Sequence, residues 1–195
     1  MPVTYTNRKG KTYILCQGTT KTGKPRYYFA REPKGKPLDN IPEGYEIREN
    51  INGLVFLAKA RPQRILPEEI AAVEAALKCH PRPHHYRLEA KHDQIVIYER
   101  ADRAAEDILS RMGSLSQLFS QRAGELQETL DRHARFSPVM RFVLDDEKSR
   151  AFHAERWCYR GRIDDWIYVS SSSAIKKMAC ELIPTLGSDT FFELY

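Results

Sequence analysis

Gly18, Gly23 and Lys24 have the G-x-x-x-x-G-K spacing of a phosphate-binding loop, and they follow the strand-like run TYILC. Such a loop wraps phosphates with backbone N–H groups, and a Ser or Thr hydroxyl after the lysine holds magnesium. Here Pro25 follows the lysine, so that hydroxyl and one backbone N–H are missing. The alternating aromatic run RYYFAR then predicts a strand where the motif needs a helix. The segment is therefore predicted to be a polar hairpin turn, and no cofactor is expected.

A strongly basic segment surrounds this turn. Residues 1–38 hold nine Lys or Arg and one acid, Glu32, which gives them a net charge of +8, whereas the remainder of the chain has −3. Lysine and arginine neutralise nucleic-acid phosphates, and aromatic rings stack on bases. We therefore expect a non-catalytic nucleic-acid-binding protein that uses a basic N-terminal hairpin with interleaved aromatic residues. The candidate nucleic-acid-binding residues are Arg8, Lys9, Lys11, Lys21, Lys24, Arg26, Tyr28 and Arg31.

The two faces of this hairpin limit which rings are available. Alternation along a strand puts Arg26 and Tyr28 on one face and Tyr27 and Phe29 on the other. One of these faces must pack on the core, so only one set of rings is expected to reach a ligand. A lysine-rich edge that resists aggregation is the alternative interpretation of the same residues.

Acidic residues in the C-terminal third indicate an alternative function. Asp145 and the later triplet Glu155-Arg156-Trp157 resemble the acid and the acid-x-lysine triplet with which a restriction-endonuclease-like core holds a divalent cation. Arginine stays protonated and is a poor substitute for the lysine, so a metal-dependent nuclease is kept only as the alternative. Asp145 also fits a turn. A third class is a protein-interaction module that uses Trp157 and Trp166.

The remaining chemistry-bearing residues indicate no metal site. Cys79, His80, His84 and His85 lie within one short loop, but they lack the paired spacings of zinc sites. The four cysteines lie far apart in the sequence, which is typical of reduced thiols and predicts a cytoplasmic protein. No apolar run is long enough to span a membrane, and the N-terminus lacks the apolar core of a secretory signal.

Hydrophobic periodicity predicts the elements that position these residues. Strands are predicted over 11–17, 25–31, 45–50, 54–59, 86–90, 95–100, 137–146, 151–160 and 164–170, and helices over 67–79 and 173–183. One apolar stripe, from Ile108 to Leu130, predicts a long helical segment over 101–134. The sequence thus predicts an α+β fold in which mainly antiparallel β-hairpins alternate with helices, with one long helical segment in the middle.

The same pattern gives an expected domain organisation. Residues 1–60 are expected to form a basic β-hairpin module, and residues 61–195 an α+β body that packs with it as one unit. The apolar stripe of 101–134 is expected to pack on the chain's own sheet. Pairing of this helix between two copies, in a homo-oligomer, is the alternative.

Four runs, TNRKGKTYIL, KPRYYF, IPEGYEIRENING and ERWCYRGRIDDWIY, together resemble a family of uncharacterised bacterial proteins. The resemblance covers most of the chain, including both ends. It implies a bacterial, cytoplasmic protein that forms a full-length unit, and it implies no activity, cofactor or catalytic residue.

Overall fold

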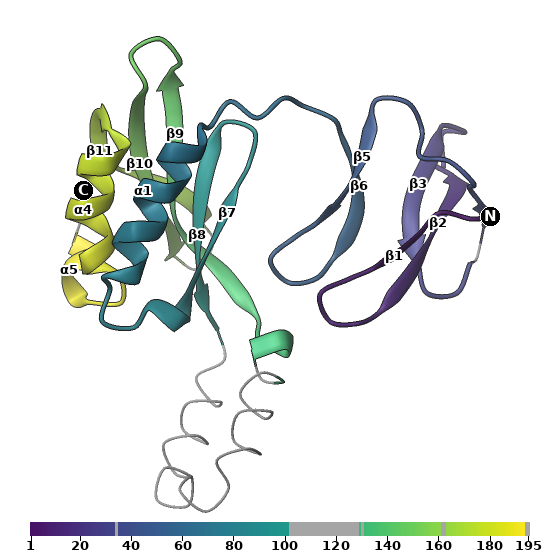
Figure 1. The fold of residues 1–195 in the computed structure, drawn as a ribbon, viewed down its shortest axis with the longest axis horizontal. Helices are drawn as coiled ribbons and strands as arrows, with labels where there is room; N and C mark the ends of the chain where they lie inside the picture. Colours follow the sequence, from purple (N-terminus) through teal and green to yellow (C-terminus); the bar gives the residue numbers. More distant parts are fainter. Residues whose placement is uncertain (34, 102–128, 130, 161–162, 194–195) are drawn as a thin grey trace, which may run out of the picture. The chain divides into compact units, whose positions relative to one another are not determined.

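The computed structural model describes residues 1–33, 35–101, 129, 131–160 and 163–193 (Figure 1). The chain divides into two compact units. Unit 1 contains Met1–Arg61 and the segment Asp102–Arg135, of which only 129 and 131–135 are described. Unit 2 contains Pro62–Ala101 and Phe136–Tyr195. Antiparallel strands are the commonest regular structure in the described part of both units.

In unit 1, the long strand β2 is the centre of a four-stranded antiparallel sheet. One edge of β2 pairs with β3, and the other edge pairs first with β1 and then with the short β4. A separate hairpin of β5 and β6 adds a second sheet. The strands are β1 (Thr4–Thr6), β2 (Thr12–Thr19), β3 (Pro25–Ala30), β4 (Lys36–Pro37), β5 (Tyr45–Glu49) and β6 (Val55–Lys59).

The buried side chain of Asn7 connects the two sheets of unit 1. Its Nδ2 donates to the carbonyl oxygen of Gly53, at 2.6 Å, in the turn between β5 and β6. Its Oδ1 accepts from the backbone N–H groups of Lys9 and Lys11, at 3.1 and 2.9 Å. Because both ends of the amide are hydrogen-bonded, its burial does not leave an unsatisfied polar group. The β1–β2 turn is thereby fixed against the second hairpin.

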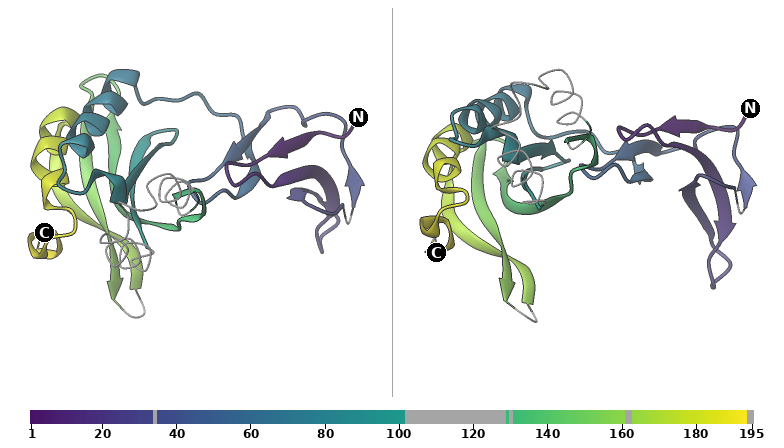
Figure 2. Two further views of the ribbon diagram at one scale, coloured as in Figure 1. Left: turned by 60° about the horizontal axis from the view of Figure 1, so that its bottom comes forward. Right: turned by 90° about the horizontal axis from the view of Figure 1, so that it is seen from below.

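Unit 2 contains a five-stranded antiparallel sheet in the order β11-β10-β9-β8-β7. The strands are β7 (Tyr86–Ala90), β8 (Gln94–Arg100), β9 (Phe136–Asp146), β10 (Ala151–Arg160) and β11 (Ile163–Ala174). The helices are α1 (Pro67–Lys78), η1 (Pro83–His85), α4 (Ile175–Leu182), η3 (Ile183–Thr185) and α5 (Asp189–Glu193). Helices α1 and α4 lie side by side on one face of this sheet (Figure 1, Figure 2).

The core of unit 2 lies between the sheet and these two helices. Alternate residues of the middle strands point into it, because successive side chains of a strand point to opposite faces. Its fully buried large side chains are Val73, Ile95, Ile97, Met140, Phe142, Phe152, Met178 and Ile183. These residues come from α1, α4, η3 and the three middle strands, so one core holds all of these elements together.

The start of α1 is fixed by a proline and by a partly buried ion pair. Pro67 occupies the first turn, where a missing N–H costs no hydrogen bond. The carboxylate of Glu69 accepts from the N–H of Leu66 at 2.8 Å and from Nε of Arg150 at 2.8 Å. Arg150 lies in the turn between β9 and β10, so this pair attaches the beginning of the helix to the sheet.

The predicted fold class is wrong. Strand residues make up 45% and helix residues 22% of the described chain, and they form three antiparallel sheets with short helices rather than hairpins alternating with helices. Strand β8 pairs with β9, so the hairpins predicted on either side of the long helix belong to one sheet. Strand β11 continues to Ala174, where the sequence predicts a helix. Alternation indicates that a segment is a strand but leaves its partner open.

The long helical segment predicted over 101–134 is not part of the described fold. Residues 102–128 and 130 lie outside the described residues, and Thr129 and Asp131–His133 are the helical positions described there. Homo-oligomer formation through this segment therefore stays a prediction. None of the described helices is both long and apolar enough to span a membrane.

We expect Phe142→Ala to lower the free energy of unfolding by about 3–5 kcal/mol, because the change removes a large, fully buried ring from the core of unit 2. The matched control is Phe192→Ala, since 61% of the surface of Phe192 is exposed. We expect that change to cost about 0.5 kcal/mol or less. Chemical denaturation followed by circular dichroism measures both, and equal effects would contradict the core position of Phe142.

Tyr86 gives unit 2 a measurable pH dependence. Burial, together with the nearby Glu99 carboxylate, raises the pKa of Tyr86 from 10.0 to about 12. Between these two values the folded chain keeps a proton that the unfolded chain releases, so the free energy of unfolding falls as the pH rises through this interval. We expect Tyr86→Phe to make this decline shallower and to remove one late-titrating tyrosine from an ultraviolet titration. An unchanged titration would contradict the raised pKa.

Candidate nucleic-acid interface

The turn between β2 and β3 is closed by its own hydrogen bonds. The N–H of Thr20 donates to the carbonyl oxygen of Lys24, and the N–H groups of Gly23 and Lys24 donate to the carbonyl and hydroxyl oxygens of Thr20, at 2.9–3.1 Å. Gly23 has φ +77°, a left-handed conformation that glycine adopts without strain. Because these N–H groups point into the turn, they cannot wrap a phosphate as a nucleotide-binding loop does.

A ring contact shows which face of the β2–β3 hairpin packs against the β5–β6 hairpin. The ring of Tyr27 makes an edge contact with the ring of Tyr45 in β5, with the centroids 5.7 Å apart. The face that carries Tyr27 is therefore covered by the second hairpin. Arg26 and Tyr28 are the neighbours of Tyr27 in β3, so they lie on the opposite face. On that face Arg26 is exposed, whereas Tyr28 is half-buried and its cross-strand neighbour Cys16 is fully buried.

Two glycines make room for the ring of Tyr28. A Cβ atom at Gly18 would lie 3.3 Å from the Tyr28 ring. A Cβ atom at Gly35 would lie 2.7 Å from the Tyr28 hydroxyl and 2.6 Å from the carbonyl oxygen of Gln17. The ring is half-buried along this stretch of backbone. Since the ring is already held in position, a base that stacks on it does not have to order it first.

The structure separates the eight candidate residues into two sets at opposite ends of β2. The eight residues of this strand span about 25 Å, at about 3.3 Å for each residue. Ala30 pairs with Ile14, so the end of β3 lies near the β1–β2 turn. The base group, near that turn, is Arg8, Lys9, Lys11 and Arg31. The other four, Lys21, Lys24, Arg26 and Tyr28, lie toward the β2–β3 turn.

Acidic residues accompany the base group. The backbone N–H of Arg8 donates to Oε1 of Glu49 at 2.9 Å, and the hydroxyl of Tyr5 donates to Oε2 of the same carboxylate at 3.1 Å. Glu32 directly follows Arg31 in the sequence. These negative charges offset part of the positive charge at this end of β2. The base group therefore attracts a phosphate less strongly than the cations at the other end.

A fourth cation joins the three at the β2–β3 turn. Lys36, in β4, pairs in register with Gln17, which lies in the turn-side half of β2. The sequence candidates missed Lys36 because a two-residue strand has no periodic pattern, and its only signal was its place in the basic segment. The tip group is defined as Lys21, Lys24, Arg26 and Lys36. All four side chains are exposed, and within the described part of the chain none of them forms an ion pair.

The residues of the alternative nuclease site, Asp145 and Glu155, do lie together in unit 2. His153 connects them, with Nδ1 2.5 Å from Oδ1 of Asp145 and Nε2 3.3 Å from Oε1 of Glu155. Glu155 also accepts a hydrogen bond from the guanidinium of Arg141, which supplies the positive charge that a bound cation would otherwise supply. The described residues contain no group of three or more His, Cys, Asp or Glu side chains that could hold a metal ion.

Two other features singled out in the sequence have structural roles. Trp157 and Trp166 contact each other edge-on across β10 and β11, with ring centroids 5.1 Å apart, and both are half-buried. The guanidinium of Arg141 lies 4.4 Å from the centre of the Trp166 ring. His80 is buried, and its Nε2 lies 3.1 Å from the carbonyl oxygen of Leu186, so it connects the loop after α1 to the C-terminal segment.

No family model matches the chain, and neither a curated protein nor a solved structure shows significant similarity to it. Function is therefore inferred from the residues of the chain alone.

We expect Gly35→Ala to lower the free energy of unfolding of unit 1 by about 1–3 kcal/mol, because the new methyl group would overlap a backbone carbonyl oxygen that cannot move away. Gly18→Ala is the matched control, since its methyl group would meet only the edge of the Tyr28 ring and needs a small adjustment. Thermal and chemical denaturation of both variants measure the difference. A larger effect at Gly18 would contradict this packing of Tyr28.

Proposed function

We propose that the tip group of unit 1 binds nucleic acid non-catalytically, through contacts with backbone phosphates. The observation that carries the proposal is the gathering of four exposed cations at one end of a hairpin, with no acid paired to them in the described residues. Lys and Arg contacts to phosphates fix a protein on nucleic acid without reading its sequence. Tyr28, on the same face as Arg26, adds a ring on which a base can stack.

The acidic residues of unit 2 give the alternative, a metal-dependent nuclease, less support. Glu155 is neutralised by Arg141, and Asp145 and Glu155 share hydrogen bonds with His153. Carboxylates that hold a catalytic cation must instead keep oxygen atoms open for the metal. A phosphate would also meet two carboxylates there before any cation is bound.

The cysteines support a cytoplasmic location as part of the proposal. All four are free thiols: Cys16 and Cys158 are buried, and Cys79 and Cys180 are exposed. Exposed thiols persist in reducing compartments, whereas secreted proteins usually pair them in disulfides. A reducing compartment that contains nucleic acid fits both the thiols and the basic hairpin.

Fluorescence anisotropy with labelled single-stranded DNA, duplex DNA and RNA, at several salt concentrations, tests the proposal. We expect the logarithm of the affinity to fall linearly with the logarithm of the salt concentration, because bound phosphates release their counterions. The triple variant Lys21→Ala/Lys24→Ala/Arg26→Ala is expected to lose about tenfold or more in affinity at low salt. Its salt slope should fall by about one for each lost contact.

The matched control is Lys148→Ala/Lys176→Ala/Lys177→Ala, which removes the same charge from exposed positions of unit 2. We expect this control to stay within about twofold of the unchanged protein and to keep its salt slope. Equal losses in both variants would show only a general attraction to net positive charge, and unchanged binding of the tip-group variant would remove the proposal. Magnesium-dependent cleavage that Glu155→Gln abolishes would favour the nuclease instead.

A further inference from the structure

Strand β7 forms one edge of the five-stranded sheet. It pairs with β8 on one side, and no other described strand pairs with it. In the turn that joins the two strands, the N–H of Lys91 donates to the carbonyl oxygen of Gln94. Hydrogen-bonded pairs alternate along an antiparallel ladder, so Glu89 and Arg87 also bond to β8. The N–H and C=O groups of the residues between them point away from the sheet.

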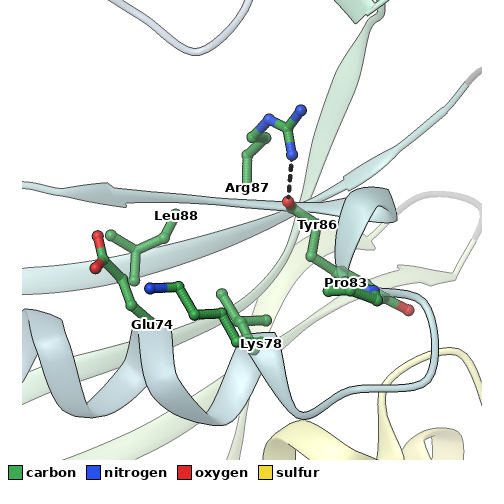
Figure 3. Close-up of a pocket in the computed structure, with 7 residues that line it drawn as sticks. Glu74, Lys78, Pro83, Tyr86, Arg87 and Leu88 are labelled. Atoms are coloured by element: carbon green, nitrogen blue, oxygen red, sulfur yellow. Dashed lines mark hydrogen bonds between the residues drawn. The ribbon is translucent and has the colours of Figure 1, made fainter. Parts of the chain in front are cut away.

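Leu88 and Ala90 are the two residues whose backbone groups face outward without a partner among the described residues. At Tyr86, which also faces outward, the N–H donates to the carbonyl oxygen of Pro83. The carbonyl oxygen of Tyr86 accepts from Nη1 of Arg87 at 3.2 Å, as Figure 3 shows. The open part of this edge is therefore short, from Leu88 to Ala90, and a second extended strand can bond to it.

A pocket lies beside this edge, between α1 and β7. Its volume is about 360 Å³, and its apolar lining includes Leu77, Pro83 and Leu88. Glu74 and Lys78 of α1 extend over it from the helix, while the side chain of Arg87 points to the other side of the strand (Figure 3). A strand added to β7 would place one side chain next to Leu88, at the mouth of this pocket. An aliphatic side chain suits that position.

The sequence of β7 is complementary to itself about Leu88. When two copies of this strand run antiparallel with Leu88 opposite Leu88, Arg87 of each copy lies opposite Glu89 of the other. Opposite charges in such cross-strand positions stabilise the pairing, and like charges destabilise it. The backbone N–H and C=O groups of Leu88 point away from the sheet in both copies. The central Leu88 pair therefore exchanges two N–H···O=C bonds. Each copy also brings the Leu88 side chain to the pocket of the other.

We infer that this chain forms a twofold-symmetric dimer in which β7 pairs with β7 of a second copy, centred on Leu88. The charge complementarity of Arg87 and Glu89 and the apolar pocket beside Leu88 favour this register. Only the Leu88 pair exchanges backbone bonds in it, because Ala90 lies opposite Tyr86, whose N–H and C=O are already bonded. The two five-stranded sheets become one continuous sheet. Since the interface contains only a short strand from each copy, the dimer dissociates on dilution.

Analytical ultracentrifugation of the full chain, over a range of concentrations and without nucleic acid, tests the inference. A reducing agent is present because the exposed Cys79 and Cys180 could link copies covalently. We expect a monomer–dimer equilibrium for the unchanged protein. Arg87→Glu and Glu89→Lys, each alone, put like charges opposite each other twice, so each should weaken association by about tenfold or more.

The charge pattern provides controls that a loss of folding cannot imitate. The double variant Arg87→Glu/Glu89→Lys exchanges the charges within each copy, so it should dimerise again. A mixture of the two single variants restores both opposite-charge pairs, so it should form heterodimers more tightly than either variant associates alone. Lys177→Glu on the exposed side of α4 should leave association unchanged. A protein that stays monomeric at all concentrations, or a dimer that neither single variant weakens, overturns the inference.

Discussion

Unit 2 depends on the pairing of β8 with β9. These strands come from chain segments on either side of residues 102–135, and their register places Ile95 beside Phe142 and Ile97 beside Met140. All four side chains are fully buried, so the same pairing that satisfies the backbone also assembles the middle of the core. Without it β7 and β8 would form a hairpin separate from the three strands β9, β10 and β11, and an isolated two-stranded hairpin is at best marginally stable in water.

The same constraint determines where the sheet ends. Once β8, β9 and β10 occupy the middle, the two remaining strands, β7 and β11, become the edges. Strand β11 runs directly into α4, which packs on the core. At Tyr86 the outward N–H and C=O groups of β7 are hydrogen-bonded to Pro83 and Arg87. At Leu88 the outward groups have no partner among the described residues. The accessible backbone of this unit is thus a consequence of strand order and not of any local motif.

In unit 1 the length of β2 controls the electrostatics. The two ends of this strand lie about 25 Å apart, whereas charges in physiological salt are screened beyond about 8 Å. The net charge of +8 in residues 1–38 therefore does not act as one field. The charge instead forms two separate patches. The patch near Arg8 has Glu49 beside it, whereas the patch near Lys24 has no acid paired to it in the described residues.

The sequence by itself determined where most of the regular elements lie. Strands β7 and β10 have the predicted bounds, α1 begins at Pro67 as its first-turn signals indicate, and the turn at Gly23 excludes a phosphate-binding loop. These features depend on neighbours in the chain, because alternation, proline and glycine act within a few residues.

Only the tertiary structure decided which strands pair, and with them the fold class and the site. It joined the predicted hairpins into one sheet, separated Lys24 from Lys9 by the length of β2, brought Lys36 beside Gln17, and connected Asp145 to Glu155 through His153. Each of these outcomes depends on residues far apart in the sequence. A period-2 pattern predicts a strand with two different faces. Which strand it pairs with, and in which register, depends on how the whole chain packs.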